Sequence, residues 1–199
     1  GIGWKTLLNK SSFLVTNVAR NYSNFFFSQR DSNFTETFKN ESIESDVQLK
    51  LDYSNKLSPN TYISIGTAAK TIKLDYDINK LTDTTSYIDP ETGNYFVIPA
   101  VTILENKRTF KGFAYAEVVQ NLFSRLKLTA GVRYDYFDLI DKKSYISPRT
   151  SLSIAITPVF SVNLAYGIFY QSPQYIWIAG NPQNSSLKDI RADHYIAGI

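Results

Sequence analysis

Three stretches of the chain, residues 126–140, 147–156 and 161–171, alternate between large apolar side chains and small, hydroxylic or charged ones. A period of two places successive side chains on opposite faces of a strand, so each stretch predicts a β-strand whose two faces differ. Together they predict a three-stranded antiparallel unit around which the rest of the chain is organised. The apolar positions are Leu126, Leu128, Ala130, Val132, Tyr134 and Tyr136 in the first strand and Val162, Leu164, Tyr166, Ile168 and Tyr170 in the third.

The connections between the predicted strands alternate in length along the chain. Residues 121–124 and 157–160 are predicted as tight turns on one edge of the sheet. Tight turns at one end and long loops at the other are typical of an outer-membrane barrel, where one face of each strand meets lipid and the other lines a wet lumen. The longer connections are predicted at residues 29–41, 75–107, 141–145 and 172–193.

The earlier part of the chain favours the same architecture. Residues 43–55 form its clearest strand, and their even positions place four formal charges on one face. Those charges require water, which a lumen supplies. In residues 13–28 the apolar period fails at Arg20, which predicts either a β-bulge or the point where the strand emerges into solvent.

Composition excludes several classes of function. The net charge is only +3, from 21 basic and 18 acidic residues that are interspersed, so the chain lacks the basic footprint of a nucleic-acid-binding protein. The absence of cysteine excludes disulfides, thiolate metal sites and cysteine nucleophiles, and His194 is the single histidine. We therefore predict no enzymatic activity, no catalytic residues, no metal site and no cofactor. No run approaches the ~18 apolar residues of a transmembrane helix.

Several short blocks of sequence resemble the barrel of TonB-dependent outer-membrane receptors. They are Gly-Val-Arg-Tyr-Asp at 131–135, Ser-Pro-Arg at 147–149, Tyr-Gly-Ile-Phe-Tyr-Gln-Ser-Pro at 166–173, Gly-Asn-Pro at 180–182 and Ser-Leu-Lys at 186–188, ahead of Tyr195 and Gly198. The resemblance is strong in the C-terminal part. In the earlier part it rests only on the periodic pattern of strands and connections. This chain has Asp189-Ile190 where the family usually has Pro-Glu after the Leu-Lys pair.

The resemblance implies an all-β fold, an antiparallel transmembrane β-barrel meander. The visible strands number about eight to nine, and the family's barrel is larger, with about 22 strands. We expect residues 1–199 to be part of one barrel domain, excised from a longer polypeptide that also carries a signal peptide, a plug domain and the closing strands.

The resemblance also implies a function in the outer membrane of a Gram-negative bacterial cell: active uptake of a scarce nutrient through a plugged barrel. The cargo is expected to be a ferric siderophore, a cobalamin or a glycan. The implied partners are outer-membrane lipid, the small-molecule or glycan ligand, and the TonB energy-coupling complex, which acts through the missing plug; nucleic acid is not expected. Residues 75–107 and 172–193 are expected outside the cell, and the tight turns in the periplasm.

Two alternatives remain open at this point. A passive porin-like barrel has the same strands without energy coupling, and a plug domain upstream would distinguish the two. A soluble β-sandwich binding module also alternates with a period of two. The sandwich accounts poorly for the alternation of loop lengths and for the charged face of residues 43–55.

Two groups of residues are candidates for binding. In the loop after residue 171, aromatic faces stand beside amides, a combination suited to ligands that mix apolar faces with polar rims; packing against neighbouring loops is the alternative. The second group is expected to face the lumen, where it contacts either the plug or the ligand, or only balances its own charges. The loop candidates are Tyr175, Trp177, Asn181, Gln183 and Asn184, and the lumen candidates are Lys127, Arg133, Asp135, Arg149 and Asn163.

Overall fold

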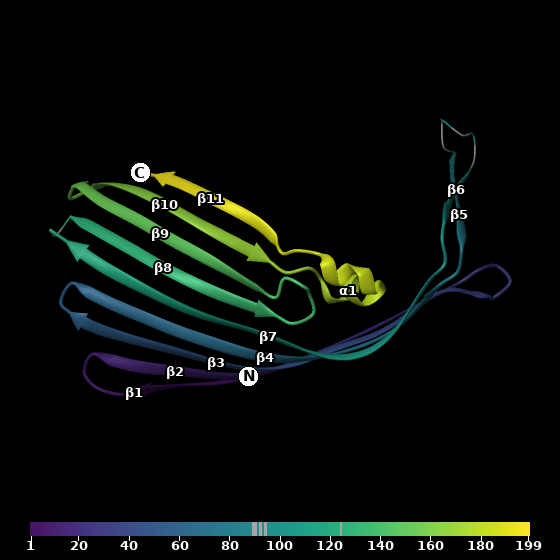
Figure 1. Ribbon diagram of the computed structural model, residues 1–199, viewed down its shortest axis with the longest axis horizontal. Coiled ribbons are helices and arrows are strands. Elements are labelled where there is room, and N and C mark those ends of the chain that lie inside the picture. The colour runs from purple at the N-terminus through teal and green to yellow at the C-terminus, as the bar shows by residue number, and fades with distance from the viewer. Residues whose placement is uncertain (89–90, 92, 94, 124) are drawn as a thin grey trace.

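The computed structural model describes residues 1–88, 91, 93, 95–123 and 125–199, and its main feature is a nine-stranded antiparallel sheet (Figure 1). Sheet neighbours are also neighbours in sequence, except that the hairpin of β5 (Asp83–Ile88) and β6 (Tyr95–Ile98) is inserted between β4 and β7. The strands of the sheet are β1 (Ile2–Leu7), β2 (Ser12–Arg30), β3 (Glu36–Ser58), β4 (Thr61–Lys80), β7 (Val101–Leu122), β8 (Leu126–Phe137), β9 (Ser144–Thr157), β10 (Phe160–Gln171) and β11 (Ile190–Gly198).

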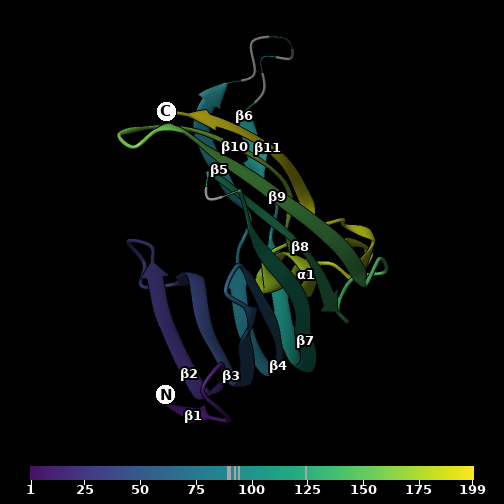
Figure 2. The same cartoon turned by 90° about the vertical axis from the view of Figure 1, so that its left-hand side faces the viewer.

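The sheet is curved, as Figures 1 and 2 show, and it carries two additions. Helix α1 (Tyr175–Gly180) and the short 3-10 helix η1 (Pro182–Ser186) connect β10 to β11 and lie at the end of the sheet opposite its tight turns. The β5–β6 hairpin stands away from the sheet at that same end. In the described part of the chain β1 and β11 do not pair with each other, so the sheet is an open meander with two free edges.

The three strands predicted from the strict alternation are confirmed. They are β8, β9 and β10, and each pairs with its neighbour in an antiparallel register. The predicted turn at 157–160 is confirmed, since β9 ends at Thr157 and β10 begins at Phe160. The turn at 121–124 connects β7 to β8, although residue 124 lies outside the described residues. The chain forms one main sheet, which contradicts the β-sandwich alternative.

Two predicted loops are wrong in extent. Residues 29–41 were expected as a loop, but β2 continues to Arg30 and β3 begins at Glu36. The connection between them is short, and the Asp31 carboxylate closes it by accepting hydrogen bonds from the backbone N–H groups of Asn33 and Thr35, at 2.8 and 2.9 Å. This stretch is polar because it contains the solvent-exposed ends of two strands. Its composition alone resembles that of a loop.

Residues 75–107 were expected to be irregular, and here too the strands are longer. β4 continues to Lys80, β7 starts at Val101, and the β5–β6 hairpin occupies the space between them. Within this stretch residues 89, 90, 92 and 94 lie outside the described residues. The alternation of short and long connections therefore holds less strictly than predicted, because the link between β2 and β3 is also short.

The apolar positions change face part of the way along the long strands. At the start of β4 Ile63 and Ile65 point to the convex face, whereas from Ile72 onward the apolar side chains point to the concave face. The convex face then carries Lys73 and Asp75 instead. At this level α1 begins to cover the concave face, so the apolar side chains there pack beneath it, while the convex face becomes polar.

Arg20 marks the same switch on β2. The pairing of β2 with β3 is regular on both sides of Arg20, and its irregularity lies at Gln29/Arg30. Of the two explanations predicted for Arg20, the bulge is therefore wrong, and emergence of the strand into solvent is consistent with the register.

A compact apolar cluster fills the concave face beneath α1. Its centre is formed by Ile72, Leu74 and Tyr76 of β4, each only 1% exposed. Ile178 of α1 is 7% exposed and packs into the cluster, which fixes the helix to the wall of the sheet. The remaining buried members are Ile78, Phe137, Leu139, Ile140 and Tyr145.

Candidate functional site

The concave face between the tight turns and α1 is lined by paired charges. Lys70 lies 2.9 Å from Asp46 across β4 and β3, and Lys50 lies 2.9 Å from Asp52 along β3. Asp46, Lys50 and Asp52 come from the charged face of residues 43–55, which was predicted to need water, and Lys70 comes from β4. Their pairing agrees with a hydrated interior in which neighbouring charges balance.

Arg133 and Asp135 form the best-oriented of these pairs. The Arg133 Nε donates to both carboxylate oxygens of Asp135, at 3.0 and 2.9 Å, and a terminal guanidinium nitrogen donates at 2.8 Å. The guanidinium also lies over the Phe113 ring, 3.7 Å from its centroid. Held by a carboxylate and an aromatic face together, Arg133 has a fixed orientation and presents one edge of its charge to the interior.

Tyr115 links three strands in the same region. Its hydroxyl donates a 2.8 Å hydrogen bond to Asp52, passing over β4 at Gly66. A Cβ at Gly66 would lie 2.3 Å from a ring carbon of Tyr115 and 2.7 Å from Asp52 Oδ1. Only glycine permits this close approach, so Gly66 is needed for the aromatic ring to lie flat against the wall.

The loop between β10 and β11 folds through its own amides. The Asn184 side chain donates a 2.6 Å hydrogen bond to the carbonyl of Trp177, and Asn181 Oδ1 accepts from the backbone N–H of Gln183 at 2.9 Å. Asn181 thereby caps η1. The amides of Asn181 and Asn184, predicted to bind ligand, are thus also used to hold α1 and η1 together.

Asp189 ties the far end of the loop to the sheet. Its backbone N–H donates to the Tyr145 hydroxyl at 3.1 Å, and its Oδ2 accepts from the Ser172 hydroxyl at 3.3 Å. Burial raises the pKa of the Asp189 carboxyl above its usual value, opposed by the nearby positive charge of Lys111. This is the position at which the chain departs from the usual Pro-Glu pattern, and the departure supplies an anchor for the loop.

An inner cavity of about 240 Å³ lies where α1 meets the charged wall. It brings together residues from the two predicted groups, because Arg133 and Asp135 line it from β8 and Tyr175 lines it from α1. The Tyr175 ring packs edge-on against Phe137, with centroids 5.9 Å apart. The other residues that line the inner cavity are Gln48, Ala68, Lys70, Lys111, Gly112 and Phe113.

Electrostatics favour a neutral phenol on Tyr175 in this cavity. Burial raises the pKa of its hydroxyl, and the negative charges of Glu44 and Asp46 raise it further. The phenol is therefore a hydrogen-bond donor at neutral pH, set opposite two lysines that face each other across β4 and β7, Lys70 and Lys111. The cavity thus combines aromatic surface, hydrogen-bond donors and positive charge.

The other predicted residues are more dispersed. By the strand register Lys127, Arg149 and Asn163 share the concave face with Arg133, but none of them lines the inner cavity. Arg149 lies over the Phe169 ring at 4.7 Å, in a second hollow shared with His194. Trp177 is 51% exposed and points away from the apolar cluster, and Asn181 and Gln183 are also exposed.

Sequence reasoning did not identify Lys70 and Lys111 as site residues. The available signal was the alternation of β7, in which the register places Phe113 and Tyr115 on the concave face with Lys111. Aromatic residues on that face obscure the signal, because the inner face of a barrel is expected to be polar. In the structure the Phe113 ring supports the Arg133 guanidinium, and the Tyr115 ring passes over Gly66 to reach Asp52.

The described residues contain no group of three His, Cys, Asp or Glu side chains arranged to hold a metal ion. Among the same residues, no helix is long and apolar enough to span a membrane. The arrangement suits binding of an organic ligand by stacking, hydrogen bonds and charge.

Comparison with known proteins adds an independent observation. A protein-family model described as "TonB dependent receptor-like, beta-barrel" matches residues 1–199. No curated protein matches the chain.

Proposed function

The chain belongs to the TonB-dependent receptor family, whose members are outer-membrane receptors and transporters, and from this we propose that it forms the wall of a receptor that actively imports a scarce nutrient. The proposed cargo is a ferric siderophore, a cobalamin or a glycan. We further propose that ligand is captured on the concave face beneath α1. Family membership favours this function over a passive porin, which has no ligand-capture step.

The inner cavity is the observation that supports this proposal. A fixed guanidinium, a neutral phenol and two lysines converge on one hollow at the end of the sheet where the long connection lies. Cargo molecules of the three classes have apolar faces bordered by oxygen atoms, which match aromatic walls and hydrogen-bond donors. The cavity is small, so it would hold an edge of such a ligand, with Trp177 available on the exposed side of α1.

The remaining concave residues are proposed to meet the plug domain. Lys127, Arg149 and Asn163 lie nearer the tight turns than the inner cavity does, on the same face. A plug that fills the lumen would contact them and transmit the pull of TonB. Because every backbone N–H and C=O in hydrocarbon must be paired, the free edges of β1 and β11 would in turn be paired by further strands of the barrel.

Replacing the aromatic residues of α1 tests ligand capture. Trp177→Ala and Tyr175→Ala should each weaken binding, by about 2 kcal/mol for Trp177 if it is an energetic hot spot. Affinity is measured on the folded, detergent-purified, full-length receptor with ferric siderophores, cobalamin and oligosaccharides as probes. Gln174→Ala is the control, because Gln174 is exposed in the same loop and its side chain does not cap α1. Unchanged binding by both aromatic variants would leave α1 a purely structural role.

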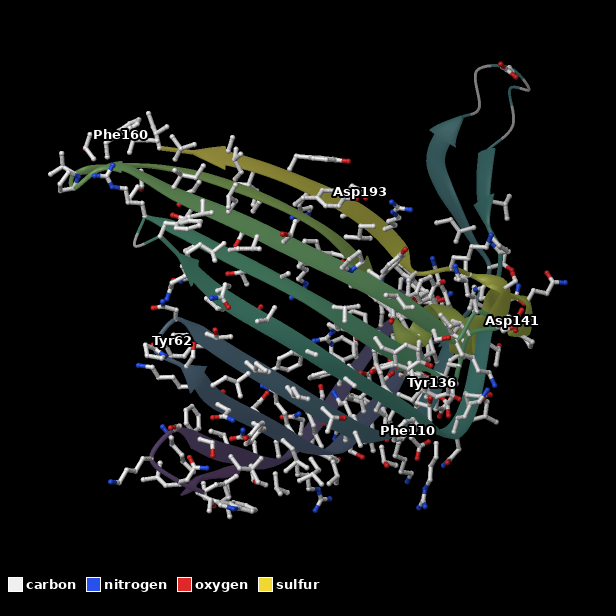
Figure 3. The ribbon with its side chains drawn as sticks, turned by 60° about the vertical axis from the view of Figure 1, so that its left-hand side comes forward. Tyr62, Phe110, Tyr136, Asp141, Phe160 and Asp193 are labelled. Carbon is white, nitrogen blue, oxygen red and sulfur yellow. The ribbon has the colours of Figure 1, made fainter. Side chains whose placement is uncertain are left out.

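The orientation of the chain gives a second test. An epitope tag inserted after Gln183 should be reached by antibody on intact cells, because the long connection is expected outside the cell. A tag inserted after Val159, in the tight turn between β9 and β10, should be reached only after the outer membrane is permeabilised. In Figure 3 Tyr62 and Phe160 lie at the tight turns, and Tyr136 and Asp141 lie at the other end of the sheet, near α1. Labelling in the opposite order would invert the topology.

A further inference from the structure

Three exposed basic side chains gather on the convex face of the long strands. Arg20 of β2, Lys73 of β4 and Arg108 of β7 line a hollow of about 230 Å³, here called the outer basic pocket. The register places all three on the face opposite α1 and the inner cavity. The other lining residues are Ser45, Asp46, Val47 and Thr71.

The charges of this pocket are poorly balanced within the protein. Lys73 and Arg108 lie directly opposite each other on β4 and β7, an arrangement of like charges that destabilises a sheet. In the part of the chain that the structure describes, the side chains of Arg20 and Arg108 make no ion pair or hydrogen bond, and the Lys73 ammonium has only a 3.7 Å contact with the Asp75 carboxylate. The Asp46 carboxylate is occupied elsewhere, by Lys70 at 2.9 Å and by the Asn21 amide at 3.0 Å.

The position of the outer basic pocket relative to the membrane follows from the change of the apolar residues from the convex to the concave face. On its tight-turn side the convex surface is apolar, with Val18, Val47 and Leu49 exposed by 40, 53 and 45%. On its other side the convex surface carries charged residues such as Glu41 and Asp77. The pocket therefore lies where the strands leave hydrocarbon, at the level of lipid headgroups.

A pair of aromatic side chains supports this placement of the pocket at the membrane interface. Phe110 lies two residues after Arg108 on the same convex face. Its ring centroid is 6.0 Å from that of Tyr136. The two side chains lie together on adjacent strands (Figure 3). Aromatic residues gather at the interface between hydrocarbon and headgroups in membrane barrels.

We propose that the outer basic pocket binds a phosphate group of a phosphorylated glycolipid, of the lipid A type, in the outer leaflet of the outer membrane. Two guanidinium groups and an ammonium can each donate to phosphate oxygens, and guanidinium groups do so with two parallel hydrogen bonds. The bound anion offsets the repulsion between Lys73 and Arg108. The proposal rests on the outer-membrane location, and it is independent of which nutrient is imported.

The direction in which the pocket opens favours a lipid as the source of this phosphate. Its basic residues face outward, away from the lumen through which a soluble ligand would pass. The apolar surface directly beside it offers contact for acyl chains, which a free phosphate ion does not have. A glycolipid satisfies both surfaces together.

Native mass spectrometry of the detergent-purified, full-length receptor tests the proposal. The probes are lipid A, the same lipid without its phosphates, and inorganic phosphate as a competitor. The wild type should retain lipid A and bind the dephosphorylated lipid at least tenfold more weakly, and equimolar inorganic phosphate should not displace lipid A. The double variant Arg20→Gln/Arg108→Gln should lose lipid A to a similar degree. The control, Lys10→Gln/Arg125→Gln, removes two exposed cations at the tight-turn end and should retain it.

Each result decides the question. Equal retention of lipid A by the double variant, or equal binding of both lipids by the wild type, would overturn the proposal. Displacement by equimolar inorganic phosphate would show a general anion site and overturn the assignment to lipid. Heat-modifiable migration on gels verifies that the variants are folded, and the comparison of two lipids on the wild type needs no variant. Nutrient binding measured in parallel separates failure of this proposal from failure of the import function.

Discussion

Val132→Arg and Leu164→Arg are expected to block assembly of the full-length receptor in the outer membrane. Val132 is 48% exposed and Leu164 46% exposed, and the register places both on the convex face, far from the outer basic pocket. A charge on the lipid face costs about 2–4 kcal/mol near the midplane of the bilayer and little at the interfaces. That cost is a large share of the net stability of a typical folded domain.

Thr129→Arg and Asn163→Arg are matched controls on the same two strands. Both residues point to the concave face, where the neighbouring side chains already include Lys127 and Arg149, so a new charge there is expected to meet polar surroundings and not lipid. The measurement is the yield of heat-modifiable receptor in the outer-membrane fraction. Equal tolerance of all four substitutions would contradict the assignment of the two faces.

The sequence was sufficient to predict the strands whose environment is uniform. In β8 and β10 the convex face is apolar and the concave face is mostly small or polar along much of the strand, so a single period of two describes them. The tight turn between β9 and β10 follows from the same pattern, because the alternation stops and resumes around Pro158. The family membership inferred from short blocks in this region also holds for the whole chain.

The long strands could not be delimited in this way, because their environment changes along their length. In β4 the apolar positions move from the convex to the concave face between Ile65 and Ile72, so no single period fits the whole strand. The same change made the polar strand ends around residues 29–41 look like a loop. A change of phase without a turn signal was the available clue, and Arg20 was its clearest instance.

Helix α1 was also beyond sequence reasoning. It is only six residues long, it has no side-chain cap at its start, and no acidic residue lies in its first turn. Such a short segment is not stable as an isolated helix, so its conformation depends on packing against the sheet. The apolar run around Trp177 was recognised, but the sequence left open whether it bound ligand or packed.

Ile178→Asp is expected to detach α1 from the wall of the sheet. Ile178 is 7% exposed and packs into the cluster formed by Ile72, Leu74 and Tyr76. A carboxylate at this position would have no positively charged partner among the residues of that cluster. Burying an unpaired charge costs several kcal/mol, more than a six-residue helix can offset, so the segment will leave the wall rather than bury the charge.

Hydrogen exchange on the full-length receptor measures this effect. Backbone amides of α1 and η1 should exchange much faster in Ile178→Asp, while those of β8 and β9 stay protected. Trp177→Asp is the control, because Trp177 is 51% exposed on the same helix and its replacement leaves the cluster intact. Ile178→Ala should lie between them, since truncating a buried isoleucine costs about 2–5 kcal/mol. Wild-type protection of α1 in Ile178→Asp would mean that the cluster does not hold the helix, and the inner cavity would then need another support for its Tyr175 wall.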